Sequence, residues 1–215
     1  MTHLNDADRA ATVFTTVQSR ASLWLPGSAY SCIKGAYYEV DTGDAVPVTQ
    51  HPFRRSPEQA ADVEWHIRQN VSLGVLVPGV GAWATPAFVV GQKGKPHGRM
   101  VCDYRKVNSV TRRMYHPMPA VMEVIRRVMG ANLFTGLDAV SGFNQLELSR
   151  AASEKLAIVV PSGLYFWKVL PFGPVDGPQA FTSVMRRIFQ DAKCLEIYTD
   201  DLAVHTGPRD AATSA

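Results

Sequence analysis

The stretch that most constrains this fold reads CLEIYTDDLAVHT and occupies residues 194–206. In it, two adjacent acids, Asp200 and Asp201, lie between two short apolar runs. Two such runs separated by a polar pair are typical of a β-hairpin, with the pair at or beside the turn. The stretch contains no Lys or Arg, and a carboxylate that is buried without a partner is costly. The pattern therefore indicates that a positive partner comes from outside the chain.

A third acid, Asp138, ends another strand pattern and is the candidate neighbour of this pair. It is flanked by Leu137 and Ala139. Carboxylates that converge at strand ends, with no His or Cys among them, form an all-oxygen site that suits Mg²⁺ or Mn²⁺ better than zinc. Two such ions about 3.5–4 Å apart are the recurring device for in-line phosphoryl transfer. The alternative is that the double aspartate is an ordinary surface turn.

The rest of the chain alternates helical and strand patterns. Ser56 is a candidate N-cap followed by Pro57, and this helix is expected to end at Gly74. Residues 85–107 predict a β-hairpin with a long basic loop. Further helices are expected at 119–129 and 176–189, and further strands at 133–140, 143–149 and 156–170. This order predicts an α+β fold, with helices behind one face of a largely antiparallel sheet whose open face carries the acids.

Composition narrows the class of protein. The 215 residues, of which 19% are charged, suffice for a core and for one or two globular units. Three widely spaced cysteines argue against a disulfide framework and a zinc site, and favour a reducing compartment. The N-terminus lacks the features of a signal peptide, and no apolar run approaches the ~18 residues that cross a bilayer. We therefore expect a soluble, untargeted, intracellular protein of the cytoplasm, with no membrane partner.

Basic residues are unevenly distributed, although the net charge is only +3. One stretch contains Lys93, Lys95, Arg99, Arg105, Lys106, Arg112 and Arg113, with only Asp103 as an acid. Such a stretch is either a solvated face or a contact surface for nucleic acid.

The motif YTDDLAV resembles the Y-x-D-D signature of reverse transcriptases. The segments HPFRRSPEQAADVEWHIRQN, GRMVCDYRKVNSVT, YHPMP, LFTGLDAVSGFNQLELS and GLYFWKVLPFGPVDGPQAF resemble successive blocks of polymerases from long-terminal-repeat retroelements, particularly the Gypsy/Ty3 type. They follow the family's order and spacing from about Gly43 to Thr206. The resemblance implies the fingers and palm of a right-hand polymerase, an RNA-directed DNA polymerase within a retroelement polyprotein.

The same resemblance implies a division of the chain. Residues 1–45 are expected to be a poorly structured linker and residues 207–215 a tail. The fingers would comprise 46–112 and 146–175, and the palm 113–145 and 176–206, which includes the Y-x-D-D hairpin. Because the chain ends shortly after the double aspartate, we expect the thumb and RNase H portions of the polyprotein to lie outside it.

Family motifs also imply roles for single residues. Asp138, Asp200 and Asp201 match the catalytic carboxylates, which would hold two Mg²⁺ ions, with Mn²⁺ as a substitute. Phe143 matches the bulky residue that excludes a ribose 2′-hydroxyl, so that DNA is made. The positions implied to bind dNTP are Arg99, Lys93 or Lys95, Phe143, Phe172 and Gly173. The positions implied to contact primer or template are Tyr198, Arg105 and Asn108.

The chain departs from the family pattern at two places. The basic fingertip is reduced to GQKGK, which weakens the lysine assignment, and GPVDGP replaces the usual Leu-Thr-Asn-Ala stretch. The alternative function is a catalytically inactive remnant that retains only nucleic-acid binding. A two-metal nuclease is a third hypothesis, which leaves Phe143 unexplained. For the polymerase, the expected partners are an RNA or DNA template with its primer, and dNTP.

Overall fold

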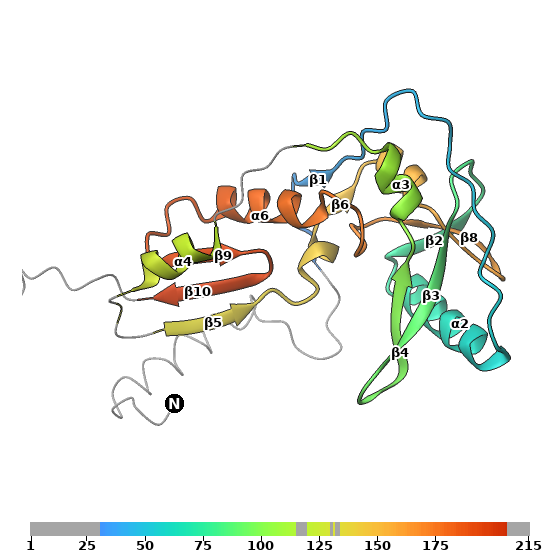
Figure 1. Ribbon diagram of the computed structural model, residues 1–215, viewed down its shortest axis with the longest axis horizontal. Helices are drawn as coiled ribbons and strands as arrows, with labels where there is room; N and C mark the ends of the chain where they lie inside the picture. Colours follow the sequence, from blue (N-terminus) through green and yellow to red (C-terminus); the bar gives the residue numbers. More distant parts are fainter. Residues whose placement is uncertain (1–30, 115–119, 130, 132–133, 206–215) are drawn as a thin grey trace, which may run out of the picture.

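The structure is a computed structural model that describes residues 31–114, 120–129, 131 and 134–205. The described chain is elongated, with two parts side by side (Figure 1). One part contains a five-stranded sheet of order β2-β8-β7-β3-β4, and the other a three-stranded sheet of order β5-β10-β9. A two-stranded ribbon, β1-β6, lies between them in Figure 1.

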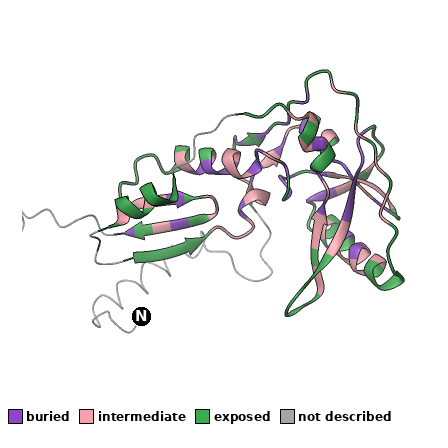
Figure 2. Ribbon diagram, viewed as in Figure 1, coloured by how far each residue is buried: buried purple, intermediate pink, exposed green. Residues whose placement is uncertain are grey.

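The five-stranded sheet forms the first part together with one long helix. Its strands are β2 (Leu76–Gly79), β8 (Gly163–Trp167), β7 (Ile158–Val160), β3 (Thr85–Gln92) and β4 (Lys95–Cys102), and the helix is α2 (Pro57–Ser72). β3 pairs with β7 in parallel, and the other neighbouring strands pair antiparallel. Leu76, Leu156 and Ile158 are fully buried here. Figure 2 shows the buried residues gathered along these strands, where they form the core of this part.

α2 begins and ends where the sequence predicts. The Ser56 side chain accepts a hydrogen bond from the Gln59 amide (3.3 Å), and Pro57 occupies the first turn. Val63 and Ile67 are buried against the sheet. The helix ends before Gly74, whose φ of +72° is available to glycine without strain. The helix prediction is therefore confirmed together with its capping residues.

The three-stranded sheet forms the second part with two helices. Its strands are β5 (Phe134–Asp138), β10 (Asp201–His205) and β9 (Leu195–Tyr198), and the helices are α4 (Val121–Val128) and α6 (Gly177–Ile188). Both helices contact β9, and Arg127 of α4 forms an ion pair with Glu196 of β9 (3.5 Å). Every residue of β5 is exposed. The predicted α+β arrangement, an antiparallel sheet backed by helices, is confirmed here.

The prediction of a poorly structured linker through residue 45 is wrong for its described end. β1 (Tyr37–Tyr38) pairs in parallel with β6 (Glu147–Leu148), and Tyr38 is only 2% exposed. The segment has no periodic pattern of its own, because it acquires order by docking onto a strand that lies more than a hundred positions away.

Three further details differ from the sequence expectations. The basic loop of the β3–β4 hairpin is a tight turn at Lys93 and Gly94, where Gly94 has a φ of +79°. The strand expected at 143–149 is instead the 3₁₀ helix η2 (Gly142–Gln145) followed by β6. The short helices α3 (Arg105–Val110) and α5 (Arg150–Lys155) were missed, since six residues are too few to show a helical period. Within the described ranges, no helix is long and apolar enough to cross a membrane.

Candidate active site

The three strands of the smaller sheet place an acidic row on its open face. Asp201 lies opposite Asp138 on one side and opposite Tyr198 on the other. Residues directly opposite each other in antiparallel strands project to the same face of a sheet. In the next row, which projects to the other face, Ile197 and Leu202 are buried and Leu137 of β5 is exposed. Asp138, Tyr198 and Asp201 therefore stand on the same face of the sheet, because side chains alternate between the two faces along each strand.

The turn between β9 and β10 holds the second aspartate. Thr199 and Asp200 are its two central residues, and Thr199 has a φ of +54°, a left-handed conformation that is unusual for a residue other than glycine. The Thr199 hydroxyl donates a hydrogen bond to Asp200 Oδ1 (2.8 Å). The backbone amide of Ala139 donates to the Asp200 carbonyl oxygen (3.0 Å). The turn is thereby joined to the end of β5, next to Asp138.

The expectation that the double aspartate is buried is wrong. Asp201 and Asp138 are exposed, and Asp200 is half-buried. Of the flanking residues, Ile197 and Leu202 are buried on the opposite face, whereas Asp200 lies in the turn and Asp201 on the open face. The cost of burying an unpaired charge therefore does not explain this motif.

This row has the donor chemistry of a magnesium or manganese site, because it offers only carboxylate oxygens. Asp138 and Asp201 face each other in register, and Asp200 is next in sequence. In the described part of the chain, no three acidic, His or Cys side chains are already drawn together into a metal-binding cluster. The strand register brings the backbones of Asp138 and Asp201 opposite each other at one edge of the sheet.

Aromatic rings connect the 3₁₀ helix η2 to the β3–β4 hairpin. The Phe143 ring packs edge-on against Phe172 (centroids 4.9 Å apart) and against Phe181 of α6 (5.6 Å). The Arg99 guanidinium lies over the Phe172 ring at 4.6 Å from its centroid. Three positions predicted to bind dNTP, Arg99, Phe143 and Phe172, therefore lie in one continuous contact chain.

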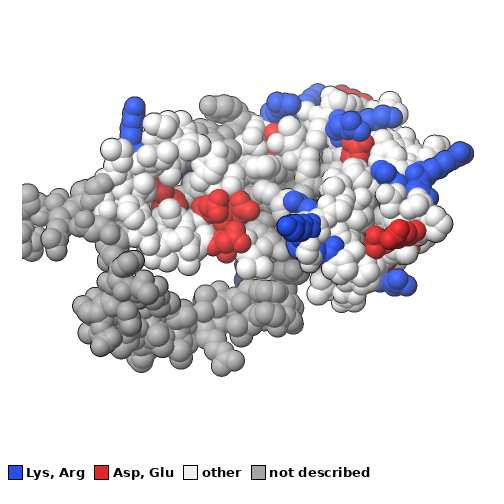
Figure 3. Space-filling view, turned by 60° about the horizontal axis from the view of Figure 1, so that its bottom comes forward, with Lys and Arg blue, Asp and Glu red and all other residues white. Residues whose placement is uncertain are grey.

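Two of these residues border a pocket. Arg99 and Phe172 line a pocket of about 450 Å³ with Ser141 and Asn144. The Asn144 Oδ1 atom is buried and has no hydrogen-bond partner among the described residues. Figure 3 shows acidic side chains gathered in the middle of one face and a group of basic side chains beside them. Acidic and basic side chains are thus neighbours on this face of the molecule.

Asn108 and Gly173 are predicted to contact different ligands, yet they contact each other. The Asn108 side-chain amide donates to the Gly173 carbonyl (3.0 Å), and its Oδ1 accepts from the Val175 amide (3.0 Å). Gly173 has a φ of +114°, and a β-carbon there would lie 3.1 Å from the Tyr104 ring. Asn108 therefore holds the loop that carries Phe172.

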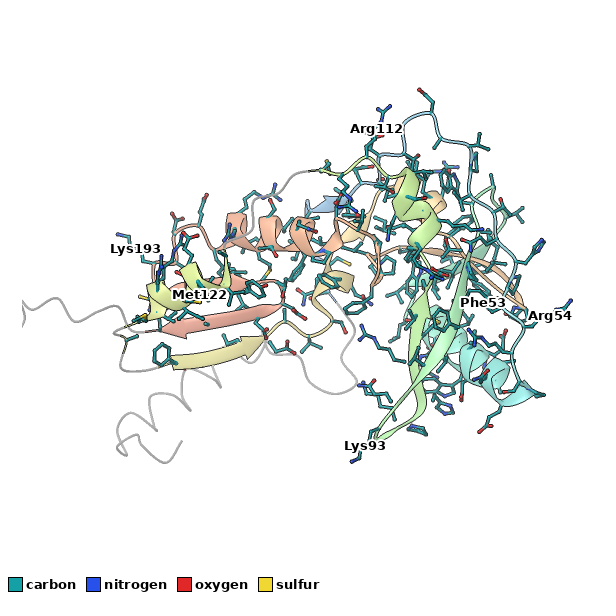
Figure 4. The ribbon with its side chains drawn as sticks, in the orientation of Figure 1. Phe53, Arg54, Lys93, Arg112, Met122 and Lys193 are labelled. Carbon is teal, nitrogen blue, oxygen red and sulfur yellow. The ribbon has the colours of Figure 1, made fainter. Side chains whose placement is uncertain are left out.

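The other predicted contact residues are exposed around this space. Lys93 stands at the tip of the β3–β4 hairpin (Figure 4) and Lys95 begins β4. Arg105 makes a two-pronged ion pair with Asp103 (2.7 and 2.6 Å), and this hydrogen bonding lowers the pKa of the Asp103 carboxyl. Tyr198 is 37% exposed on the acidic row.

Sequence reasoning missed the aromatic wall of the pocket. Trp65, His66, His97 and Trp167 line it, and the Trp65 and His97 rings are stacked with centroids 4.3 Å apart. Trp65 and His66 lie in a predicted helix and His97 in a predicted hairpin. Their separate positions in the sequence gave no signal that they meet.

An antiparallel sheet backed by helices, with two carboxylates in register on its strands, in a chain that also carries a basic hairpin, is the arrangement of a right-hand polymerase fold. A profile described as reverse transcriptase (RNA-dependent DNA polymerase) matches residues 91–214. The chain belongs to this reverse transcriptase family, and the resemblance found in its motifs is confirmed.

Similar proteins include viral and transposon polyproteins. The chain is 29% identical over 157 residues to the enzymatic polyprotein of Figwort mosaic virus, covering 71% of this chain and 24% of the polyprotein. It is 27% identical over 186 residues to the retrovirus-related Pol polyprotein from transposon opus of Drosophila melanogaster (84% and 18%). A third relative is the Transposon Tf2-3 polyprotein of Schizosaccharomyces pombe, at 27% identity (81% and 13%). The chain thus spans a quarter or less of these relatives, and the transposon relatives fit the predicted Gypsy/Ty3 type.

Solved structures share the fold. The foamy viral protease-reverse transcriptase in complex with RNA/DNA hybrid superposes with a TM-score of 0.84 at 18% identity, covering 95% of this chain and 28% of that one. The selenomethionine-labelled mutant of the Prototype Foamy Virus enzyme gives 0.82 at 22% identity, with the same coverage. The predicted polymerase fold is therefore confirmed.

Proposed function

We propose that this chain is the fingers and palm portion of an RNA-directed DNA polymerase. It would extend a primer on an RNA or DNA template with dNTP. The observation that carries this proposal is the register of Asp201 with Asp138 on the open face of the palm sheet. We further propose that the fingers are residues 46–112 and 146–175 and the palm residues 113–145 and 176–206.

In this proposal, Asp138, Asp200 and Asp201 hold divalent ions, Mg²⁺ by preference. When bound, these ions neutralise charge at the reacting phosphate and favour ionisation of the primer 3′-hydroxyl. The reaction joins the 3′-oxygen to the α-phosphorus and releases pyrophosphate. The palm residues contribute mainly position, because the donors stand on paired strands of a sheet.

The remaining side chains would bind and select the nucleotide. Arg99 presents a planar, permanently charged group to the triphosphate, and the Phe172 ring below it limits its orientation. Phe143 is held between Phe172 and Phe181, so that a rigid ring would stand against the sugar. Tyr198 would lie beneath the primer terminus, with Arg105 and Lys93 near nucleic acid or triphosphate.

Primer extension tests the proposal directly. The chain is incubated with poly(rA)/oligo(dT), dTTP and Mg²⁺, and we expect incorporation that Asp200→Asn abolishes. Asp191→Asn, which alters an exposed acid in the loop after α6, is the matched control and should retain incorporation. Salt-sensitive binding of the template without incorporation would support the inactive remnant instead. Cleavage of the nucleic acid in the absence of dNTP would support the nuclease.

A further inference from the structure

His97 is held on three sides by one helix. Its Nδ1 atom lies 2.8 Å from Asp62 Oδ1, and its ring stacks on Trp65 with an interplanar angle of 19°. Its backbone carbonyl lies 2.9 Å from His66 Nε2, within hydrogen-bonding distance. Three side chains of α2, those of Trp65, Asp62 and His66, therefore contact the single residue His97 of β4.

The helix is suited to act as a fixed support. Asp62, Trp65 and His66 occupy positions i, i+3 and i+4, which lie on one face of a helix. The buried residues Val63 (3% exposed) and Ile67 (2%) anchor the same helix in the core. His97 is thus connected to the most firmly packed part of the fingers, although its own side chain is 38% exposed.

The strand that carries His97 departs from regular pairing at this point. Val90 pairs with Arg99 and Gln92 pairs with Lys95, so one residue of β3 faces three of β4. Gly98 has a φ of +58°, and a β-carbon there would lie 2.4 Å from the Val90 carbonyl oxygen. A bulge of this kind interrupts the hydrogen-bonded ladder and bends the strand. Backbone pairing therefore does not fix the strand between Lys95 and Arg99.

Arg99 directly follows this bulge. Its guanidinium rests on Phe172, and both residues line the same pocket as Trp65, His66 and His97. We propose that the contacts of Asp62, Trp65 and His66 with His97, hereafter the His97 clamp, position Arg99 for the triphosphate of the incoming dNTP. These are positioning residues, since they act through Arg99. The inference takes the dNTP ligand from the proposed function. The bulge is the structural reason why Arg99 needs support from outside its own strand.

Steady-state primer extension with the full chain tests the clamp. His97→Ala should raise the KM for dTTP about tenfold and leave kcat within about twofold, because binding is impaired while the carboxylates are untouched. Asp62→Ala should act in the same direction. The double variant should be no worse than His97→Ala, because both changes break one clamp. Gln69→Ala, an exposed side chain of the same helix, is the control and should change neither constant.

Hydrogen exchange supplies a readout that does not depend on activity. In His97→Ala, the amides of residues 95–102 should exchange faster than in the wild type, and those of β7 and β8 should not. Unchanged exchange in β4, or an unchanged KM in an active variant, would refute the clamp. An inactive wild-type chain would refute the proposed function, and the exchange comparison would still decide whether the clamp holds the strand.

Discussion

Asp138 and Asp201 lie directly opposite each other on paired antiparallel strands, at the edge where the β9–β10 turn meets the end of β5. Sixty-odd positions separate them in the sequence, and neither strand contains Lys or Arg. Like charges in opposed positions weaken a sheet unless a cation lies between them. The pairing has consequences that can be measured without nucleic acid.

Asp201→Asn should stabilise the protein in the absence of divalent ions. Removing the repulsion is expected to raise the free energy of unfolding by about 0.5 kcal/mol at low salt. Mg²⁺ should raise the melting temperature of the wild type and have a much smaller effect on the variant. Thermal unfolding with and without MgCl₂ measures the stability change and the effect of Mg²⁺. Asp191→Asn is the control, and its melting temperature should rise with Mg²⁺ as in the wild type. Equal Mg²⁺ responses in wild type and Asp201→Asn would contradict the assignment.

Phe143→Val should relax sugar selection. The Phe143 ring is fixed between Phe172 and Phe181, so a smaller side chain opens room for a 2′-hydroxyl. We expect the ratio of ribonucleotide to deoxynucleotide incorporation, measured as kcat/KM, to rise at least about tenfold. Phe143→Tyr retains the ring and should retain discrimination. A ratio that stays at the wild-type value in Phe143→Val would show that another group selects the sugar.

Asn108→Ala should destabilise the loop after β8. It removes hydrogen bonds to the Gly173 carbonyl and the Val175 amide, at an expected cost of about 1–2 kcal/mol in urea unfolding. Ser109→Ala is the control from the same helix, because its exposed hydroxyl bonds only to the Lys106 carbonyl. That change should cost less than about 0.5 kcal/mol. Equal costs for the two variants would mean that the loop does not depend on Asn108.

The thiols should react in a fixed order. Cys194 is exposed and Cys102 is buried, and burial raises the pKa of the Cys102 thiol to about 12. At about pH 8, iodoacetamide should modify Cys194 readily and Cys102 only after unfolding, because the thiolate is the nucleophile. Peptide mapping by mass spectrometry distinguishes them. Modification of Cys102 at a rate close to that of Cys194 in folded protein would contradict its burial.

Stability should fall in alkali. Burial raises the pKa of Cys102 and of Tyr104 above their ordinary values of 9.0 and 10.0. As the pH rises past those ordinary values, the unfolded chain loses these protons first and binds fewer than the folded one, so the free energy of unfolding decreases. Urea unfolding at a series of pH values above 9.0 measures the slope. Cys102→Ala should make the slope shallower, and an unchanged slope would show that other groups cause it.

Much of the local structure was predictable from the sequence because it depends on neighbours in the chain. The N-cap at Ser56 and the stop at Gly74 set α2, and the double aspartate correctly predicted a turn. The motifs also predicted the family, because the family's motifs occur in this sequence in their fixed order. Where local signals were absent, as in β1 or the six-residue helices, prediction failed.

The sequence by itself determined which side chains are candidates for the site, because the identity and spacing of Asp138, Asp200 and Asp201 are properties of the chain. Only the tertiary structure decided that Asp201 lies opposite Asp138, that these two acids are exposed, and that His97 meets Trp65. Those facts depend on strand register and on helix-to-strand packing between distant segments. Such contacts form only when the whole core closes, so no short stretch of sequence encodes them.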